Sequence, residues 1–177
     1  MKITKTKFKD LIIIEQEKFV DHRGELRITF HQKNLNFNKF LFEYSVTSKK
    51  NVLRGLHLQT KNPQAKFLNV IKGKIFDVLV DLRKNSNTFG KHFSIILSNQ
   101  SLYSSIYIPE GFAHGFCGLE KENIVYYSCS NYREEDHEIG ILWNDKDLNI
   151  QWPVKKTILS KKDLHNISFQ EYCDKYN

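Results

Sequence analysis

The sequence predicts an all-β protein, an antiparallel sandwich or barrel of short strands. Apolar residues recur mostly at every second position, which is the period of a strand with one buried face. Turn-forming clusters such as Lys72-Gly73-Lys74 and Ser98-Asn99-Gln100 separate these runs at a spacing of roughly ten residues. Helical spacing is weak before the C-terminal tail. The 177 residues suit a single domain, 1–177, with a hydrophobic core of its own.

A strand predicted at 51–59 carries Arg54 and His57. Simple alternation places these two side chains on opposite faces. A bulge at Gly55 would bring them onto one face, and an isolated glycine in a strand often marks a bulge. Inside a barrel the two side chains would need an anion or a carboxylate as a partner, because an unpaired buried charge is costly. The alternative is a surface strand with both side chains in water.

The strand predicted at 74–83 has an apolar face and a mixed face. The apolar face carries Phe76, Val78, Val80 and Leu82. The mixed face carries Lys74, Asp77 and Asp81, interrupted by Ile75 and Leu79. Residues 92–98 and 102–108 alternate in the same way and predict two further strands.

The segment 108–116 reads Ile-Pro-Glu-Gly-Phe-Ala-His-Gly-Phe. It predicts a tight turn followed by a strand, with His114 close to a neighbouring backbone. His114 is a candidate site residue, and the alternative is a structural histidine at the rim of the barrel.

The last predicted strand lies at 123–132, where Val125, Tyr127 and Cys129 share a face. A tyrosine directed into a cavity can donate its phenolic proton. More often, a strand tyrosine is half-buried packing. In the tail, Ser160 is expected to cap a short helical segment that leads into Asp163.

The composition is that of a globular protein, with 40% hydrophobic and 27% charged residues. The longest aliphatic run, 11–14, is far shorter than the ~20 apolar residues of a membrane-spanning helix, so no membrane partner is expected. The N-terminus shows no apolar region typical of a signal peptide. The three cysteines form no CxxC pair, which favours a reducing cytoplasm over a disulfide framework.

Basic residues exceed acidic ones, with 27 against 20 and a net charge of +7. They are scattered, which suits a solvated surface or an anionic small ligand. No helix-turn-helix, zinc module or RNP-type aromatic pair is present, so no nucleic acid is expected as a partner. Glycine-rich phosphate loops are also absent. A metal is not expected either, because the residue two positions after His57 is Gln59, and a carboxamide is a poor substitute for imidazole.

Taken together, these segments resemble the dTDP-4-dehydrorhamnose 3,5-epimerases of the cupin superfamily. The match extends from about Asp21 to Asp163. The segments that carry it are Asp21-His-Arg-Gly24, Val52-Leu-Arg-Gly-Leu-His57, Gln64-Ala-Lys66, Phe76-Asp-Val-Leu-Val-Asp-Leu-Arg83, Thr88-Phe-Gly90, Tyr107-Ile-Pro-Glu-Gly-Phe-Ala-His-Gly-Phe116 and Leu159-Ser-Lys-Lys-Asp163.

The resemblance implies a cupin-type jelly roll with short C-terminal helical segments. It also implies a homodimer without a cofactor that epimerises a nucleotide-linked 4-keto-6-deoxy sugar for polysaccharide biosynthesis. The N-terminal strands, around Asp21 to Phe30, would cross to the neighbouring subunit and complete its site.

The resemblance further implies a role for each site residue. His57 is the general base, paired with Asp163, and Tyr127 is the proton donor. Lys66 and His114 lie beside the sugar ketone. The remaining substrate-binding residues are Arg23 and Arg54 at the phosphates and sugar, the pocket tyrosine Tyr132, and Gln59. These residue types suit the chemistry, because a proton next to a ketone needs a base on one face and charge stabilisation at the oxygen.

Two departures bear on the substrate. The family commonly has an aromatic residue and a glutamate where this chain has Leu26 and Ile28. It commonly has Gln-x-Asn where this chain has Phe42-Glu43-Tyr44. We therefore expect retained chemistry with a changed nucleotide or sugar, with a GDP-linked heptose as one candidate. The alternatives are a sugar-nucleotide 3,4-ketoisomerase and a non-catalytic cupin that binds sugar nucleotides.

Overall fold

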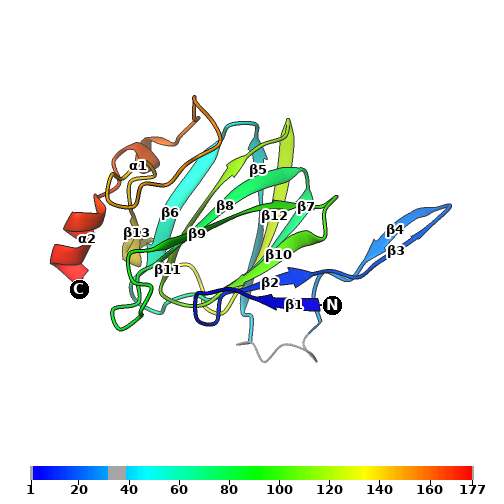
Figure 1. Cartoon of the computed structure of the whole chain (residues 1–177), viewed down its shortest axis with the longest axis horizontal. Helices are drawn as coiled ribbons and strands as arrows, with labels where there is room; N and C mark the ends of the chain where they lie inside the picture. The colour runs from blue at the N-terminus through cyan, green and yellow to red at the C-terminus, as the bar shows by residue number, and fades with distance from the viewer. Residues whose placement is uncertain (1, 32–38, 177) are drawn as a thin grey trace.

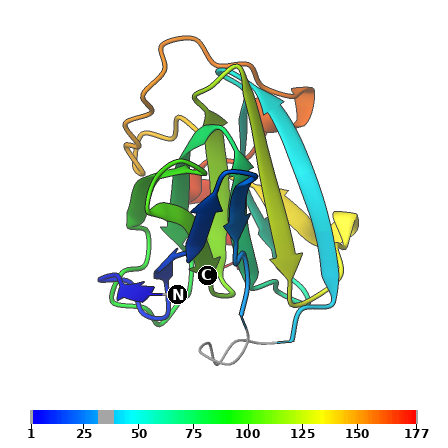
Figure 2. The ribbon, with the colours of Figure 1, turned by 90° about the vertical axis from the view of Figure 1, so that its right-hand side faces the viewer.

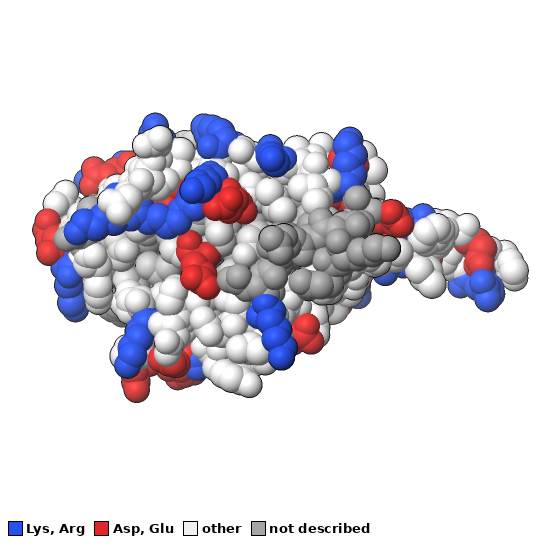
Figure 3. All heavy atoms as spheres, turned by 90° about the horizontal axis from the view of Figure 1, so that it is seen from below, with Lys and Arg blue, Asp and Glu red and all other residues white. Residues whose placement is uncertain are grey.

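The computed structural model describes residues 2–31 and 39–176. Two antiparallel sheets pack face to face, and a separate two-stranded hairpin projects from one side (Figure 1). This architecture confirms the predicted all-β jelly roll. Within the described residues, no helix is long and apolar enough to span a membrane. Lysine and arginine side chains alternate with acidic ones over the face seen in Figure 3.

The larger sheet contains six strands, and the smaller sheet contains five. Those of the larger sheet are β1 (Lys2–Lys5), β2 (Ile12–Glu15), β5 (Phe42–Lys49), β7 (Lys66–Lys72), β10 (Tyr103–Ile108) and β12 (Glu122–Cys129), in the spatial order β1-β2-β10-β7-β12-β5. Those of the smaller sheet are β6 (Leu53–Gln59), β8 (Lys74–Asp81), β9 (His92–Ser98), β11 (Phe112–Gly118) and β13 (Glu138–Gly140), in the spatial order β13-β6-β11-β8-β9.

The main core lies between the two sheets. Val125, Tyr127 and Cys129 of β12 share one buried face, as the alternation predicts, and Ile75 and Leu79 of β8 are buried in the same core. Each strand thus contributes every second side chain to the interior. The polar residues that also point inward are the ones that form the site.

A second core covers the outer face of the smaller sheet. Val78 and Val80 of β8 pack there against residues of the C-terminal segment, including Tyr172 of α2 (Phe169–Tyr176). The C-terminal tail of the chain is therefore part of the fold. Both faces of β8 are covered, which alternation within the strand alone does not reveal.

The mixed face of β8 is consequently buried, and its carboxylates have partners. Asp81 accepts hydrogen bonds from Arg83 Nε at 2.9 Å and Ser86 Oγ at 2.6 Å. Asp77 is fully buried and lies 2.6 Å from His114 Nε2. The sequence prediction grouped Asp77 with Lys74 on a mixed face, and the structure places the Asp77 carboxylate in the interior.

The predicted bulge at Gly55 is present. His57 lies opposite His114, and Arg54 lies opposite Phe116. Between these two pairs, β6 advances by three residues while β11 advances by two, so β6 contains one extra residue. Gly55 has a φ of +111°, and a Cβ atom there would lie 2.5 Å from the carbonyl oxygen of His114. Only glycine fits this position without strain. The bulge turns Arg54 and His57 toward one cavity.

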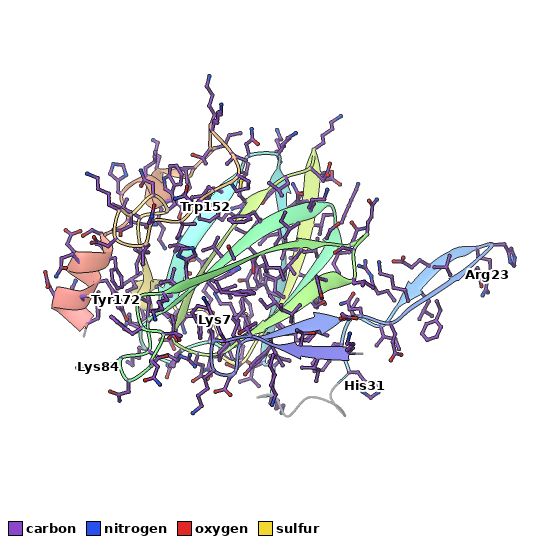
Figure 4. All side chains as sticks on the ribbon, viewed as in Figure 1. Lys7, Arg23, His31, Lys84, Trp152 and Tyr172 are labelled. Carbon is purple, nitrogen blue, oxygen red and sulfur yellow. The ribbon has the colours of Figure 1, made fainter. Side chains whose placement is uncertain are left out.

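The projecting hairpin consists of β3 (Lys18–Asp21) and β4 (Gly24–Arg27), which pair with no other strand of the described chain. Its apolar side chains Phe19, Val20 and Leu26 are exposed. Arg23 lies at the tip, far from the body of the molecule (Figure 4). Among residues 2–31 and 39–176, the hairpin therefore has no apolar partner.

The C-terminal segment contains the predicted capped helix. Ser160 Oγ accepts a hydrogen bond from the Asp163 backbone N–H at 3.0 Å and begins α1 (Lys161–Leu164). A short 3-10 helix, η2 (Glu135–His137), precedes β13. The α1 turn places the Asp163 side chain against β6, which links the tail of the chain to the site.

Candidate active site

A cavity of about 430 Å³ opens between the two sheets. Its walls combine aromatic rings with charged groups, as is usual for a small-molecule site. Six of the predicted site residues line it, namely Arg54, His57, Lys66, His114, Tyr127 and Asp163. The first and last of these residues, Arg54 and Asp163, are more than a hundred positions apart in the sequence, and the fold brings all six to one cavity.

His57 of β6 and Asp163 of α1 form the first polar pair. His57 Nε2 lies 2.6 Å from Asp163 Oδ1, and Ser160 Oγ donates to Asp163 Oδ2 at 2.9 Å. Burial alone would raise the pKa of Asp163, but the hydrogen bonds from His57 and Ser160 hold it below its ordinary value. Asp163 is thus an ionised carboxylate that orients the imidazole of His57.

His114 of β11 and Asp77 of β8 form the second pair, at 2.6 Å. Burial raises the pKa of Asp77, while the charges of His114 and Lys66 oppose this effect. The other carboxylate oxygen, Oδ2, has no hydrogen-bond partner among residues 2–31 and 39–176. The pair fixes the ring of His114 at the wall of the cavity.

Lys66 of β7 lies opposite Cys129 of β12. Burial lowers the pKa of its ammonium group, and nearby negative charges, including that of Asp77, act in the opposite direction. A cation held in this way can stabilise negative charge that develops on a substrate oxygen.

Tyr127 of β12 is only 3% exposed. Its ring stacks on Tyr44 of β5, with centroids 4.8 Å apart, and meets His114 edge-on at 5.9 Å. Burial raises the pKa of the Tyr127 phenol well above 10. The phenol therefore keeps its proton at neutral pH and can donate it.

Two arginines were predicted to contact the phosphates and sugar of the substrate, and the structure places them in different parts of the molecule. Arg54 lines the cavity, with Nε donating to Ser48 Oγ at 3.0 Å. Arg23 lies at the tip of the projecting hairpin and pairs with Asp21. A single chain therefore brings Arg54 to the site and leaves Arg23 outside it.

Comparison of the chain with known proteins identifies its family. The family model described as dTDP-4-dehydrorhamnose 3,5-epimerase matches residues 5–171. A protein of that name from Methanothermobacter thermautotrophicus is 42% identical over 166 residues, covering 90% of this chain and 89% of the relative. The chain belongs to the dTDP-4-dehydrorhamnose 3,5-epimerase family.

Solved structures of the family share the fold. The crystal structure of dTDP-4-dehydrorhamnose 3,5-epimerase from Elizabethkingia anophelis has a TM-score of 0.89 and 38% identity, covering 100% of this chain and 99% of that one. A dTDP-6-deoxy-D-glucose-3,5-epimerase from Legionella pneumophila, in complex with dTDP-4-keto-L-rhamnose, has a TM-score of 0.90 and 35% identity, covering 96% and 93%. The predicted family and isomerase class are confirmed.

In this member of the epimerase family, two further predicted substrate-binding residues, Gln59 and Tyr132, lie outside the cavity as Arg23 does. Gln59 Nε2 donates to the carbonyl oxygens of Asn62 and Tyr132, and its Oε1 accepts from the Glu134 N–H. The Gln59 amide is thus engaged in holding a loop. Tyr132 is 64% exposed, whereas its neighbour Arg133 lines the cavity.

Sequence reasoning missed a charged cluster at this wall of the cavity. Glu138 Oε2 accepts from Arg133 Nε at 3.0 Å, and Glu138 Oε1 accepts from Lys162 Nζ at 2.7 Å. Burial opposes ionisation of Glu138, yet the hydrogen bonds from Arg133 and Lys162 lower its pKa to about 2. These residues come from a loop, a short strand and a helix, so no periodicity connects them in the sequence.

The two site histidines each contact a carboxylate, His57 that of Asp163 and His114 that of Asp77. Among the described residues, no group of three or more histidine, cysteine or acidic side chains is arranged to hold a metal ion. The three cysteines are free, and none pairs with another. The two histidine–carboxylate pairs are suited to proton transfer.

Proposed function

We propose that the protein is a dTDP-4-dehydrorhamnose 3,5-epimerase. It would invert carbon centres next to the ketone of a dTDP-linked 4-keto-6-deoxy sugar. One observation carries this proposal: His57 and Tyr127 line the same cavity from opposite sheets. A substrate between them is exposed to a base on one side and to a proton donor on the other.

The reaction begins with proton removal. Neutral His57, held by Asp163, takes the proton from the carbon beside the ketone. The electron pair of the broken C–H bond moves onto the ketone oxygen and gives an enolate. Lys66 of β7 and His114 of β11, which also line the cavity, stabilise this oxygen.

The reaction ends with proton delivery from the other side. Tyr127 donates its phenolic proton to the carbon, the ketone re-forms, and the centre is inverted. The enzyme resets when His57 releases its proton and Tyr127 regains one. General acid–base catalysis of this kind contributes typically ~10²–10⁴-fold.

The substrate's diphosphate needs cationic partners. Arg54 at the cavity supplies one of them. Both relatives with solved structures described above carry dTDP in their names. The GDP-linked heptose considered from the sequence finds no support in these comparisons.

The exchange of substrate hydrogen with solvent tests this function. The enzyme is incubated in D₂O with dTDP-4-keto-6-deoxyglucose, and the product is analysed by NMR. A 3,5-epimerase incorporates deuterium at C3 and C5 and leaves the ketone at C4. A ketone moved to C3 would establish the ketoisomerase, and tight binding without exchange would establish the non-catalytic cupin.

A homodimer is the second part of the proposal. The hairpin exposes Phe19 (57%), Val20 (75%) and Leu26 (62%), and it has no apolar partner in the part of its own chain that the structure describes. Exposed apolar side chains grouped in this way favour docking to another surface. The hairpin of one subunit would dock on a second copy and bring Arg23 to its cavity. Size-exclusion chromatography with light scattering tests the mass, and a monomer would contradict the proposal. A cytoplasmic location remains a prediction from the sequence.

A further inference from the structure

A second tyrosine forms the cavity wall together with Tyr127. Tyr44 of β5 lies directly opposite Tyr127 of β12 in the antiparallel pair, and Figure 2 shows these two strands side by side. The two rings are stacked, with centroids 4.8 Å apart and an angle of 12° between their planes. Both rings line the cavity. Cross-strand aromatic pairs of this kind restrict the orientation of both partners.

The two phenols differ in their surroundings. Tyr127 is buried, and one further neighbour, His114, meets it only edge-on. Tyr44 is partly exposed and has a second aromatic contact of its own, because the centroid of the Phe42 ring lies 5.4 Å from that of the Tyr44 ring. Tyr44 is therefore fixed independently of Tyr127 and can hold the neighbouring ring in place.

The geometry points to Tyr44 as a positioning residue for the proton donor Tyr127, an inference that rests on the proposed function. The Tyr44 ring keeps the Tyr127 ring at one wall of the cavity, so that the phenolic oxygen faces the carbon that His57 deprotonates from the other sheet. A displacement of about 1 Å in such an arrangement can cost roughly 10²-fold in rate.

Misplacement of the donor has a characteristic consequence. The enolate has two fates: inversion by a proton from Tyr127, or return of a proton from His57 to the original face. Because the His57 proton exchanges with solvent, the second fate places deuterium in recovered substrate without inversion. Loss of the Tyr44 ring should therefore separate exchange from epimerisation, whereas general damage to the fold lowers both.

The experiment compares the two rates in D₂O with dTDP-4-keto-6-deoxyglucose. In Tyr44→Leu, we expect epimer formation to fall roughly 10- to 100-fold while deuterium still enters recovered substrate. Tyr44→Phe keeps the ring and should retain the wild-type ratio of the two rates. Tyr44→Asn, which also lacks the ring, is the second variant and should behave as Tyr44→Leu if the leucine variant does not fold.

A matched control removes a stacked tyrosine elsewhere. Tyr176 stacks on Tyr172 in α2, with centroids 5.4 Å apart, and lies outside the cavity. Tyr176→Leu should leave both rates unchanged.

Three results would overturn the inference while the wild type remains active. These are unchanged epimerisation in Tyr44→Leu, a parallel loss of both rates, and a Tyr44→Phe variant as impaired as Tyr44→Leu. A wild-type enzyme that neither exchanges nor epimerises would instead overturn the proposed function, and the inference with it.

Discussion

At the scale of single residues, the site depends on two carboxylates that fix two imidazoles. Asp163 could be predicted through family resemblance, which pairs it with His57 as the general base. Asp77 could not, since alternation placed it beside Lys74 on a mixed strand face. Its role follows from a covering layer on the far side of β8, which strand periodicity does not encode.

The roles of His57 and Tyr127 make the first prediction. His57→Asn should lower hydrogen exchange and epimerisation together by at least about 10²-fold, because no base remains. Tyr127→Phe should lower epimerisation by a similar factor while recovered substrate still gains deuterium. NMR of substrate and product in D₂O measures both rates. His57→Asn exchanging at the wild-type rate would contradict the assignment of the base.

Arg133 illustrates a different limit of sequence reading. Family resemblance directed attention to Tyr132, which is exposed, whereas Arg133 lines the cavity. Both residues lie in a loop after β12, where no alternation indicates which side chain points inward. The orientation is set by the contact of Arg133 with Glu138, which only the fold brings near.

At the scale of elements, the strands were predictable because most have one polar face and one apolar face. The bulge in β6 was also predictable, from an isolated glycine between Arg54 and His57. What joins β6 to α1 was not, since the His57–Asp163 contact spans 106 positions. This contact follows from the packing of α1 against β6 and not from any local sequence pattern.

The bulge makes the second prediction. Gly55→Ala would place a methyl group 2.5 Å from the His114 carbonyl oxygen, at a φ of +111° that alanine rarely adopts. We expect a loss of about 1–3 kcal/mol in the free energy of unfolding. Urea denaturation measures this loss. Activity should fall further than stability alone explains, because Arg54 and His57 lose their common orientation. Gly24→Ala has no nearby atom to meet and controls for substitution of a positive-φ glycine.

The hairpin β3–β4 makes the third prediction, through complementation between two inactive variants. Arg23→Ala keeps its own His57, and His57→Asn keeps its own Arg23. If the hairpin crosses between subunits, mixed dimers contain one site with both groups, and activity should reappear on refolding the two together. Activity no greater than the sum of the separate variants would show that Arg23 does not act across subunits.

At the scale of the whole molecule, acid sensitivity follows from buried carboxylates. Burial opposes ionisation of Asp81, but hydrogen bonds from Arg83, Ser86 and Thr88 lower its pKa from 3.8 to about 2. A lowered folded-state pKa adds stability that is complete above the unfolded value. That stability is lost as the pH falls from about 4 to about 2.

The fourth prediction tests this loss. On the order of 2 kcal/mol of the Asp81 contribution should disappear across that window. Urea unfolding at pH 7, 4 and 3 measures it, and the Asp81→Asn variant should show a shallower pH dependence than the wild type. Asp174→Asn, on the exposed side of α2, should leave the slope unchanged. An equal slope in Asp81→Asn and wild type would contradict the assignment.

The attachment of Asp163 to His57 also sets the order in which a newly translated chain gains its function. The barrel strands and the histidine are synthesised first, but the acid that orients the imidazole is added some hundred codons later. A product terminated between these positions would keep the imidazole without its counterion. Nascent chains on the ribosome should therefore remain catalytically silent until the last helices have emerged from the exit tunnel.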